Sequence, residues 1–311
     1  MEFFKRTPKI DFMAKRRVSY AISLVLVVGS LLLIGLRGLN FGIDFTGGVV
    51  LEVTYPETVD IDRTRQALEA AGFPDAQVQA FGSSRDIAVR LMPPEGEDVN
   101  QLSARVGEAL RSTDPGAQIR RTEVVGPQVG RDLAEQGGLA LLFTMIGILF
   151  YVGFRFEKKM AAGTVLAALH DPLVILGFFA ATQLTFDLAV LAAVLAVIGY
   201  SINDTVVVFD RVREVFLSTR KGTPKEMLNQ ALNETLSRTL MTSFSVLFVV
   251  VSLYLFGGET LKGFSIAIIV GVMIGTYSSI FIAAALVHDM KLKPQDLMPV
   301  KKDDAELDAL P

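Results

Sequence analysis

The protein has 311 residues, of which 51% are hydrophobic and 20% charged, and its mean hydropathy of +0.44 is too apolar for an ordinary soluble protein of this length. The net charge of −3 provides no strong field that would favour nucleic acid or another highly charged partner. Cysteine is absent, which excludes disulfides and thiolate metal sites, and two histidines argue against a histidine-rich metal cluster. The composition indicates a membrane protein, and we expect it to use no cofactor.

Hydrophobic segments predict six membrane-spanning helices, because a bilayer core of about 30 Å requires about 20 apolar residues in a helix. The predicted spans are 18–36, 138–154, 161–182, 188–209, 240–256 and 263–287. The first follows three basic residues, as a signal peptide would, but it has no A-x-A cleavage pattern and is longer than a signal core. We expect it to be a retained anchor.

Positive charges in the short loops predict the orientation of these spans, since Lys and Arg resist translocation. Six such residues lie in 1–17, three in 155–159, five in 210–237 and four in 288–311, whereas the loops 183–187 and 257–262 hold none and one. We therefore expect both termini, the loop 210–237 and the tail 288–311 on the cytoplasmic side.

The long segment 37–135, between the first two spans, is predicted to be a separate periplasmic domain. Its periodicity predicts strands at 49–55, 76–81, 86–92 and 118–125 and helices at 61–71 and 99–110. The order β-α-β-β-α-β is that of an α+β ferredoxin-like domain, in which two helices cover one face of the sheet. We expect this domain to bind rather than catalyse, with a ligandless folding module as the alternative. The remaining spans form a five-helix membrane region, 136–287.

The fourth span carries a carboxylate where a membrane helix is normally apolar. Asp204 lies 16 residues after Leu188, about 24 Å along the helix, and Asn203 stands beside it. Tyr200 and Ser201 precede it by about one turn, so three polar groups share a face that should look into the bundle. A carboxylate in the membrane costs about 2.5 kcal/mol or more, so we expect it to have a partner.

Arg238 is the predicted partner of Asp204. It enters the fifth span from the cytoplasmic loop, at a depth similar to that of Asp204, and Thr242 and Ser245 follow at helical spacing on the same face. A low dielectric favours the protonated acid and a nearby guanidinium favours the carboxylate, so the pair could load and release a proton as it opens and closes. We favour this proton relay over a static ion pair that fixes helix register, which is the alternative.

Asp171 is a candidate for a second relay group or for part of a polar network. It stands between His170 and Pro172, about 16 Å along the third span. A proline kink whose freed backbone groups are satisfied by neighbouring helices explains the motif equally well.

Two segments near the cytoplasmic side have their own patterns. Thr223, Pro224 and Glu226 form a capping box with proline at the first helical position, which predicts an amphipathic helix lying on the membrane surface or against a partner. The charged tail after Lys291 has no periodicity, so we expect it to be disordered.

Five motifs make the chain resemble the SecF family of bacterial protein-export subunits. They are FGIDFTGG at 41–48, VVGPQVG at 124–130, LHDP at 169–172, GYSINDTVVVFDRVRE at 199–214 and LSRTLMTS at 236–243. Together they cover nearly the whole chain, and the long fourth-span motif is highly specific. FGIDFTGG is also similar to a SecD motif, but the chain length and the single outer domain favour SecF.

The resemblance implies a six-span half-unit of the resistance-nodulation-division superfamily in the bacterial inner membrane. It implies a heterodimer with SecD, association with the SecYEG channel, YajC and YidC, and a functional link to the SecA ATPase. The implied function is to use the proton-motive force in late steps of preprotein translocation on the periplasmic side. The functional Asp of the NDT motif and Arg of the SRT motif in that family match Asp204 and Arg238 here.

A conformational hypothesis follows from these residues and this resemblance. Protonation of Asp204 would release Arg238, and the outer domain would reorient through a hinge at Gly42, Gly47 and Gly48. A tight turn leading into the first strand explains the glycines equally well.

Three other functions stay open. A stand-alone proton-coupled efflux transporter of small molecules shares the bundle type, although such pumps carry two six-span halves in one chain. An intramembrane aspartyl protease would use Asp171 and Asp204, but neither has a G-x-G-D context, so we predict no enzymatic activity. A structural scaffold would be indifferent to the proton gradient.

Overall fold

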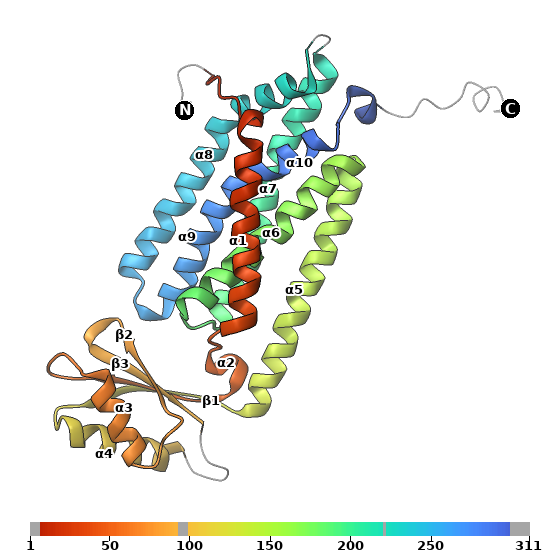
Figure 1. Ribbon diagram of the computed structural model, residues 1–311. Coiled ribbons are helices and arrows are strands. Elements are labelled where there is room, and N and C mark those ends of the chain that lie inside the picture. Colours follow the sequence, from red (N-terminus) through yellow and green to blue (C-terminus); the bar gives the residue numbers. More distant parts are fainter. Residues whose placement is uncertain (1–6, 93–98, 220–221, 299–311) are drawn as a thin grey trace.

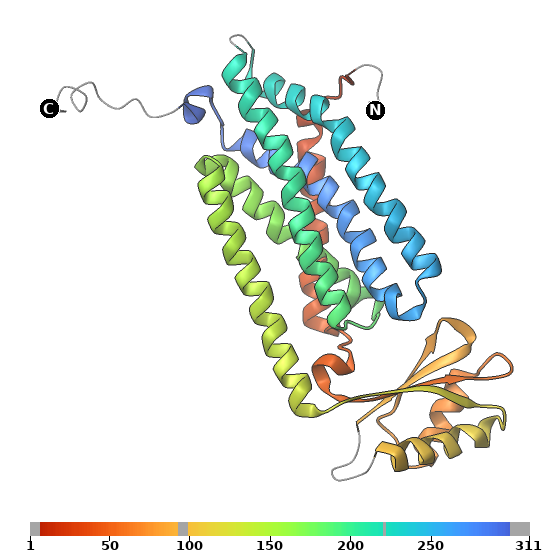
Figure 2. The same cartoon turned by 180° about the vertical axis from the view of Figure 1, so that it is seen from behind.

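A computed structural model describes residues 7–92, 99–219 and 222–298, and it shows a helical bundle with a smaller domain at one end (Figure 1). Within these residues, six helical segments are long and apolar enough to cross a membrane, as predicted. The segments before the first span and after the last one both lie at the end of the bundle away from the small domain (Figures 1 and 2). We call this the terminal end and the opposite one the domain end.

Helix α7 is central to the bundle, because it packs against α6, α8 and α9, while α1 packs on α6. The first five spans are α1 (Arg16–Arg37), α5 (Pro127–Arg155), α6 (Lys158–Thr182), α7 (Leu188–Ser218) and α8 (Pro224–Phe256). The last span consists of α9 (Lys262–Tyr277), the π-helix η3 (Ser278–Ala283) and α10 (Ala284–Asp289). Short helices are η1 (Met13–Lys15), α2 (Ile43–Thr46), η2 (Glu259–Leu261) and η4 (Pro294–Leu297).

Small residues allow these helices to approach closely. A Cβ on Gly271 of α9 would overlap Val197 of α7, and one on Gly275 would lie 3.1 Å from Ser201. A Cβ on Gly177 of α6 would likewise overlap Ser30 of α1. The predicted first span is therefore an integral part of the bundle.

The small domain has the predicted ferredoxin-like fold. Its elements are β1 (Gly48–Thr54), α3 (Ile61–Ala70), β2 (Gln77–Phe81), β3 (Ser83–Leu91), α4 (Val99–Thr113) and β4 (Gln118–Val125). The strands form one antiparallel sheet in the order β2-β3-β1-β4, with Val49 opposite Leu91 in the central pair. Alternate strand residues such as Leu51 and Val89 are fully buried in one core with α3 and α4. Figure 1 shows these helices on the face of the sheet away from the bundle, so the uncovered face looks toward the membrane spans.

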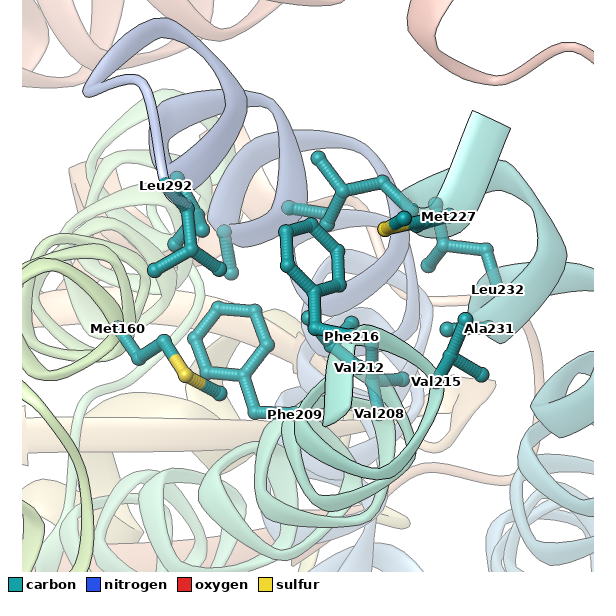
Figure 3. Packing of buried hydrophobic residues seen from close by; sticks show 14 of the residues in the cluster. Met160, Val208, Phe209, Val212, Val215, Phe216, Met227, Ala231, Leu232 and Leu292 are labelled. Atoms are coloured by element: carbon teal, nitrogen blue, oxygen red, sulfur yellow. The ribbon is translucent and has the colours of Figure 1, made fainter. Parts of the chain in front are cut away.

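Most of the predicted loop 210–237 is helix, and its first part was not predicted to be helical. α7 continues to Ser218 and α8 begins at Pro224, so only 219–223 connect them. The extension of α7 carries an apolar face, including Val212 and Phe216, which packs on the amphipathic start of α8 (Figure 3). The helix predicted to lie on the membrane surface or against a partner is therefore in the core of the chain itself. Its buried residues there are Met227, Leu228, Ala231 and Leu232.

The helix that leaves the small domain begins before the predicted boundary at residue 135. The sheet ends at Val125, and α5 begins directly afterwards with Pro127 at its first position. The first turns of α5 are polar, so a search for apolar segments could not detect them. Figure 1 shows α5 reaching the level of the sheet.

The segment that follows α10 is ordered as far as the structure describes it, in contrast to the predicted disorder after Lys291. Leu292 and Leu297 are buried in the core at the terminal end, and Lys159 Nζ lies 2.7 Å from Asp296 Oδ2. The anchoring leucines are isolated, so no periodicity reveals them. Residues 299–311 lie outside the described part of the chain.

Candidate functional site

Helix α7 places the predicted intramembrane acid inside the bundle. Asp204 is 2% exposed, and Ser201 and Thr205 on the same helix are 1% exposed. Val197, one turn before Ser201, and Val208, one turn after Asp204, are equally buried. This spacing is that of one helix face, and the face is turned toward the other helices.

The carboxylate of Asp204 has few partners. Thr242 on α8 places its Oγ1 3.4 Å from Asp204 Oδ1, but the same hydroxyl donates at 2.9 Å to the carbonyl oxygen of Thr239. Asp204 Oδ2 is buried and has no hydrogen-bond partner among the described residues. Buried polar atoms are normally paired, so an open carboxylate oxygen at this depth is a site at which a proton could be bound.

Arg238 lies one turn before Thr242 on α8, and its side chain is exposed at the surface of the bundle. Both it and Asp204 are described, and no hydrogen bond or ion pair joins the two side chains. The structure thus brings the predicted pair onto neighbouring helices and leaves the pair open.

Tyr200 and Asn203 are placed differently from each other. The Tyr200 hydroxyl donates at 2.9 Å to Ser243 Oγ, which lies 2.7 Å from Thr276 Oγ1, so a polar chain crosses from α7 through α8 to α9. Asn203 is exposed on the opposite side of α7 from the buried face. Of these two candidates, only Tyr200 belongs to the polar network around Asp204.

Asp171 on α6 is the centre of a second polar cluster. It is 0% exposed, and its Oδ1 lies 2.9 Å from His170 Nδ1. Its Oδ2 accepts hydrogen bonds from Ser201 Oγ and, at 2.9 Å, from Ser278 Oγ. His170 Nε2 is buried and unpaired within the described part of the chain. Asp171 is therefore far better satisfied than Asp204, and Ser201 connects its cluster to α7.

The π-helix η3 supplies partners that the sequence did not reveal. Ser278, at its start, donates to Asp171, while the hydroxyl of its neighbour Ser279 lies 2.8 Å from Thr205 Oγ1. A π-turn rotates consecutive residues differently from an α-turn, so both serines reach inward. The polar run 276–279 near the end of the last span was the available signal.

The predicted hinge glycines lie where the backbone packs closely against neighbouring residues. Gly47 and Gly48 have φ values of 71° and 123°, and a Cβ on Gly47 would lie 2.7 Å from the Cα of Pro127 at the start of α5. Gly42 has an ordinary φ of −68° and lies against Asp187, 3.1 Å from the position of an added Cβ. All three stand where the chain passes from the bundle into the sheet.

The chemistry that this arrangement can support is the binding and release of protons by buried carboxylates. Within the described residues, no group of three or more His, Asp or Glu side chains could hold a metal ion. Two carboxylates lie inside the bundle, and the one of Asp204 has an open oxygen whereas the one of Asp171 is fully hydrogen-bonded.

Comparison with known proteins gives consistent matches. The family model described as the C-terminal part of the protein export membrane proteins SecD/SecF matches residues 105–293, and the SecD/SecF GG motif matches 32–55. The chain is 48% identical over 297 residues to the protein translocase subunit SecF of Pseudomonas aeruginosa, covering 95% of this chain and 96% of that one. It is 42% identical over 313 residues to the SecF of Vibrio alginolyticus, covering 100% and 99%.

Two solved structures of SecDF are also similar. The crystal structure of SecDF from Thermus thermophilus matches with a TM-score of 0.84 and 34% identity, covering 93% of this chain and 40% of that one. A super-membrane-facing form of SecDF matches with the same coverage and 35% identity but a TM-score of 0.69. This chain spans 40% of the length of either solved chain. The arrangement of this chain is more similar to the first SecDF structure than to the super-membrane-facing form.

Proposed function

The chain belongs to the SecD/SecF family of protein-export membrane proteins, among the SecF translocase subunits, and from this premise we propose that it uses the proton-motive force to drive late steps of preprotein translocation. The observation that carries the proposal is the open carboxylate of Asp204, which is buried in the bundle beside Thr242 of α8. Arg238 lies one helix turn before Thr242 on α8. Intramembrane acids that lack full pairing are typical of proton pathways. A proton is the coupling ion, and no cofactor takes part.

Proton binding at Asp204 acts on the balance between two arrangements of the bundle. With the acid charged, attraction draws Arg238 toward it. With the acid neutral, that attraction is absent and Arg238 can stay at the surface. A transmembrane potential supplies about 2.3 kcal/mol per charge per 100 mV, which is enough to shift a two-state equilibrium by more than tenfold. The unequal similarity to two solved SecDF forms supports a fold with more than one arrangement.

Asp171 has a secondary role in this proposal. Its carboxylate accepts bonds from both α7 and η3, so it holds the helices that surround Asp204 in register. It serves as a polar network residue.

The partners and the location follow the family. The solved SecDF chains support association with SecD. The SecYEG channel, YajC and YidC are further proposed partners, with SecA acting earlier and the unfolded preprotein as substrate. The protein is a multi-pass membrane protein, proposed to lie in the bacterial inner membrane with its terminal end cytoplasmic and its ferredoxin-like domain periplasmic. The Lys and Arg residues of the terminal end support this orientation.

Transport of small molecules by this chain alone is not favoured. The relatives that it matches over nearly their whole length are translocase subunits, and the solved neighbours join a comparable segment to a larger chain. The same names indicate a transport subunit rather than an enzyme.

Export into membrane vesicles with and without an imposed proton gradient tests the proposal. Asp204→Asn should abolish the gradient-dependent part of preprotein export and leave the ATP-driven part unchanged. Asp210→Asn is the matched control, because Asp210 lies on the same helix but is half-exposed and paired with Arg155 at 2.5 Å. Gradient-dependent export that persists without the Asp204 carboxylate would contradict the proposal.

A further inference from the structure

The ferredoxin-like domain faces the bundle across a cleft. The cleft has a volume of ≈ 470 Å³ and is lined by Val50 and Arg90 of the sheet and by Thr185 and Tyr254 of the bundle, among others. The tip of the β2–β3 hairpin also comes close to the bundle, since a Cβ on Gly82 would lie 2.7 Å from side-chain atoms of Glu259. Because this cleft separates the sheet from the bundle, we expect the side chains that cross it to influence strongly the angle between the ferredoxin-like domain and the bundle.

Two connections at the domain end are bound to each other. One is the segment 38–47, which leads into the sheet, and the other is 183–187, which leads into α7. Gly42 N donates to Phe186 O and Phe186 N donates to Asn40 O, both at 2.8 Å. The rings of Phe41 and Phe45 pack against that of Phe186 with centroids 6.0 Å apart. These contacts make the entry to the sheet and the entry to α7 one unit.

The N-terminus of α7 is capped from both connections. Asp187 Oδ1 accepts from Val190 N at 2.8 Å, and Asp44 Oδ2 accepts from Leu188 N at 2.9 Å. Carboxylates are favoured at this end of a helix by its free amides and its dipole. A displacement of α7 along its axis therefore acts directly on the segment that carries Asp44.

Arg90 joins the sheet to this unit. Its Nη1 donates to Phe41 O at 2.6 Å and to Asn40 Oδ1 at 3.3 Å, and its Nη2 donates to Thr185 Oγ1 at 3.4 Å. Arg90 stands near the end of β3, opposite Val50 of β1, and lines the cleft. One guanidinium thus contacts both connections at once.

The charges around Arg90 make its position sensitive to displacement. Burial lowers the pKa of Arg90, while the nearby carboxylates of Asp187 and Asp44 act in the opposite direction. Burial also raises the pKa of Asp187. A displacement that breaks the hydrogen bonds of the partly buried guanidinium would leave a charged donor without acceptors, which is costly.

We propose that Arg90 is a positioning residue for proton-driven translocation, which transmits displacements of α7 to the ferredoxin-like domain. The inference rests on the proposed function, because it takes Asp204 as the group whose charge changes. Asp204 and Leu188 lie on one continuous helix about 24 Å apart. Arg90 is the charged contact through which that helix end acts on the sheet.

Spin-label distances test the proposal without an export assay. The chain contains no cysteine, so Glu69→Cys on α3 and Phe256→Cys at the end of α8, both exposed, can carry a single pair of labels. The full chain is studied in liposomes with its SecD partner, with Asp204 or Asp204→Asn. Each form is measured with native Arg90, with Arg90→Gln, with Arg90→Lys and with Arg85→Gln. Arg85 is the matched control, because it lies on the same strand but is exposed.

We expect Asp204→Asn to shift the label distance when Arg90 is native and in the Arg85→Gln background. The shift should be lost with Arg90→Gln and partly restored with Arg90→Lys, which keeps the charge but not the two-pronged geometry. A purely structural role would alter the distance without removing its response to Asp204. An equal shift without Arg90, or no shift with native Arg90, overturns the inference. The vesicle export result for Asp204→Asn decides the proposed function separately.

Discussion

The hydroxyl of Thr242 on α8 lies 3.4 Å from Asp204 Oδ1 on α7 and joins the two helices at the buried acid. The hydroxyl is shared with a backbone carbonyl, so Asp204 is held only loosely. Proton binding at Asp204 can then occur without the rupture of a strong hydrogen bond.

Thr242→Val should therefore reduce gradient-dependent export far less than Asp204→Asn does. The lost contact is weak, so we expect a reduction of about fivefold or less, corresponding to about 1 kcal/mol. Thr242→Ser, which keeps the hydroxyl, is the control and should export normally. Initial export rates in vesicles give the measurement, and complete loss of gradient dependence in Thr242→Val would show that the hydroxyl is essential.

Asp171→Leu should destabilise the bundle strongly, because three donors would lose their common acceptor. We expect a loss of about 3–5 kcal/mol in the free energy of unfolding, measured in detergent micelles. Asp171→Asn retains an acceptor oxygen and should recover part of that stability. Normal gradient-dependent export by a stable Asp171→Asn would restrict this residue to the polar network, whereas its loss would establish a role in proton transfer.

Gly47→Ala should be poorly tolerated, since the added Cβ would lie 2.7 Å from Pro127 in a backbone conformation with φ of 71°. The expected cost is about 1–3 kcal/mol, seen as a lower unfolding temperature. Gly126→Ala serves as the control, because nothing lies within 4 Å of its added Cβ and its φ is −64°. Equal unfolding temperatures for the two variants would show that the junction adapts freely.

Phe216→Ala should lower the free energy of unfolding by about 3–5 kcal/mol, because Phe216 is 1% exposed in the core at the terminal end. Leu217→Ala, at a position 47% exposed, should change it little. Denaturant titration of the two variants compares neighbouring residues of the same helix extension. If Phe216→Ala were as stable as Leu217→Ala, the terminal end would not contribute to the folding core.

The apolar segments were long enough to predict all six spans, and the period of two predicted the strands of the ferredoxin-like sheet. The extension of α7 was missed, because there the signal changes from uniform apolarity to a one-sided stripe such as Val212 and Phe216. A search for apolar segments detects the first pattern and not the second.

The sequence predicted which residues of the candidate site share a helix face, but it did not predict the contacts between residues on different helices. Helical spacing places Tyr200, Ser201 and Asp204 on one face, whereas the separation of Asp204 and Arg238 depends on the packing of two helices. Ser278 was missed because a π-turn changes which residues point inward. Arg90 resembles any exposed strand arginine until the bundle is placed opposite it.

The lengths of α7 and α8, 31 and 33 residues, have a mechanical consequence. At 1.5 Å per residue they measure about 46 Å and 50 Å, against about 30 Å for the hydrocarbon layer. Each helix is therefore longer than the hydrocarbon layer is thick and extends beyond it. A tilt of only about 5° around the midpoint of α7 would swing each tip by about 2 Å, which is comparable to the length of a hydrogen bond.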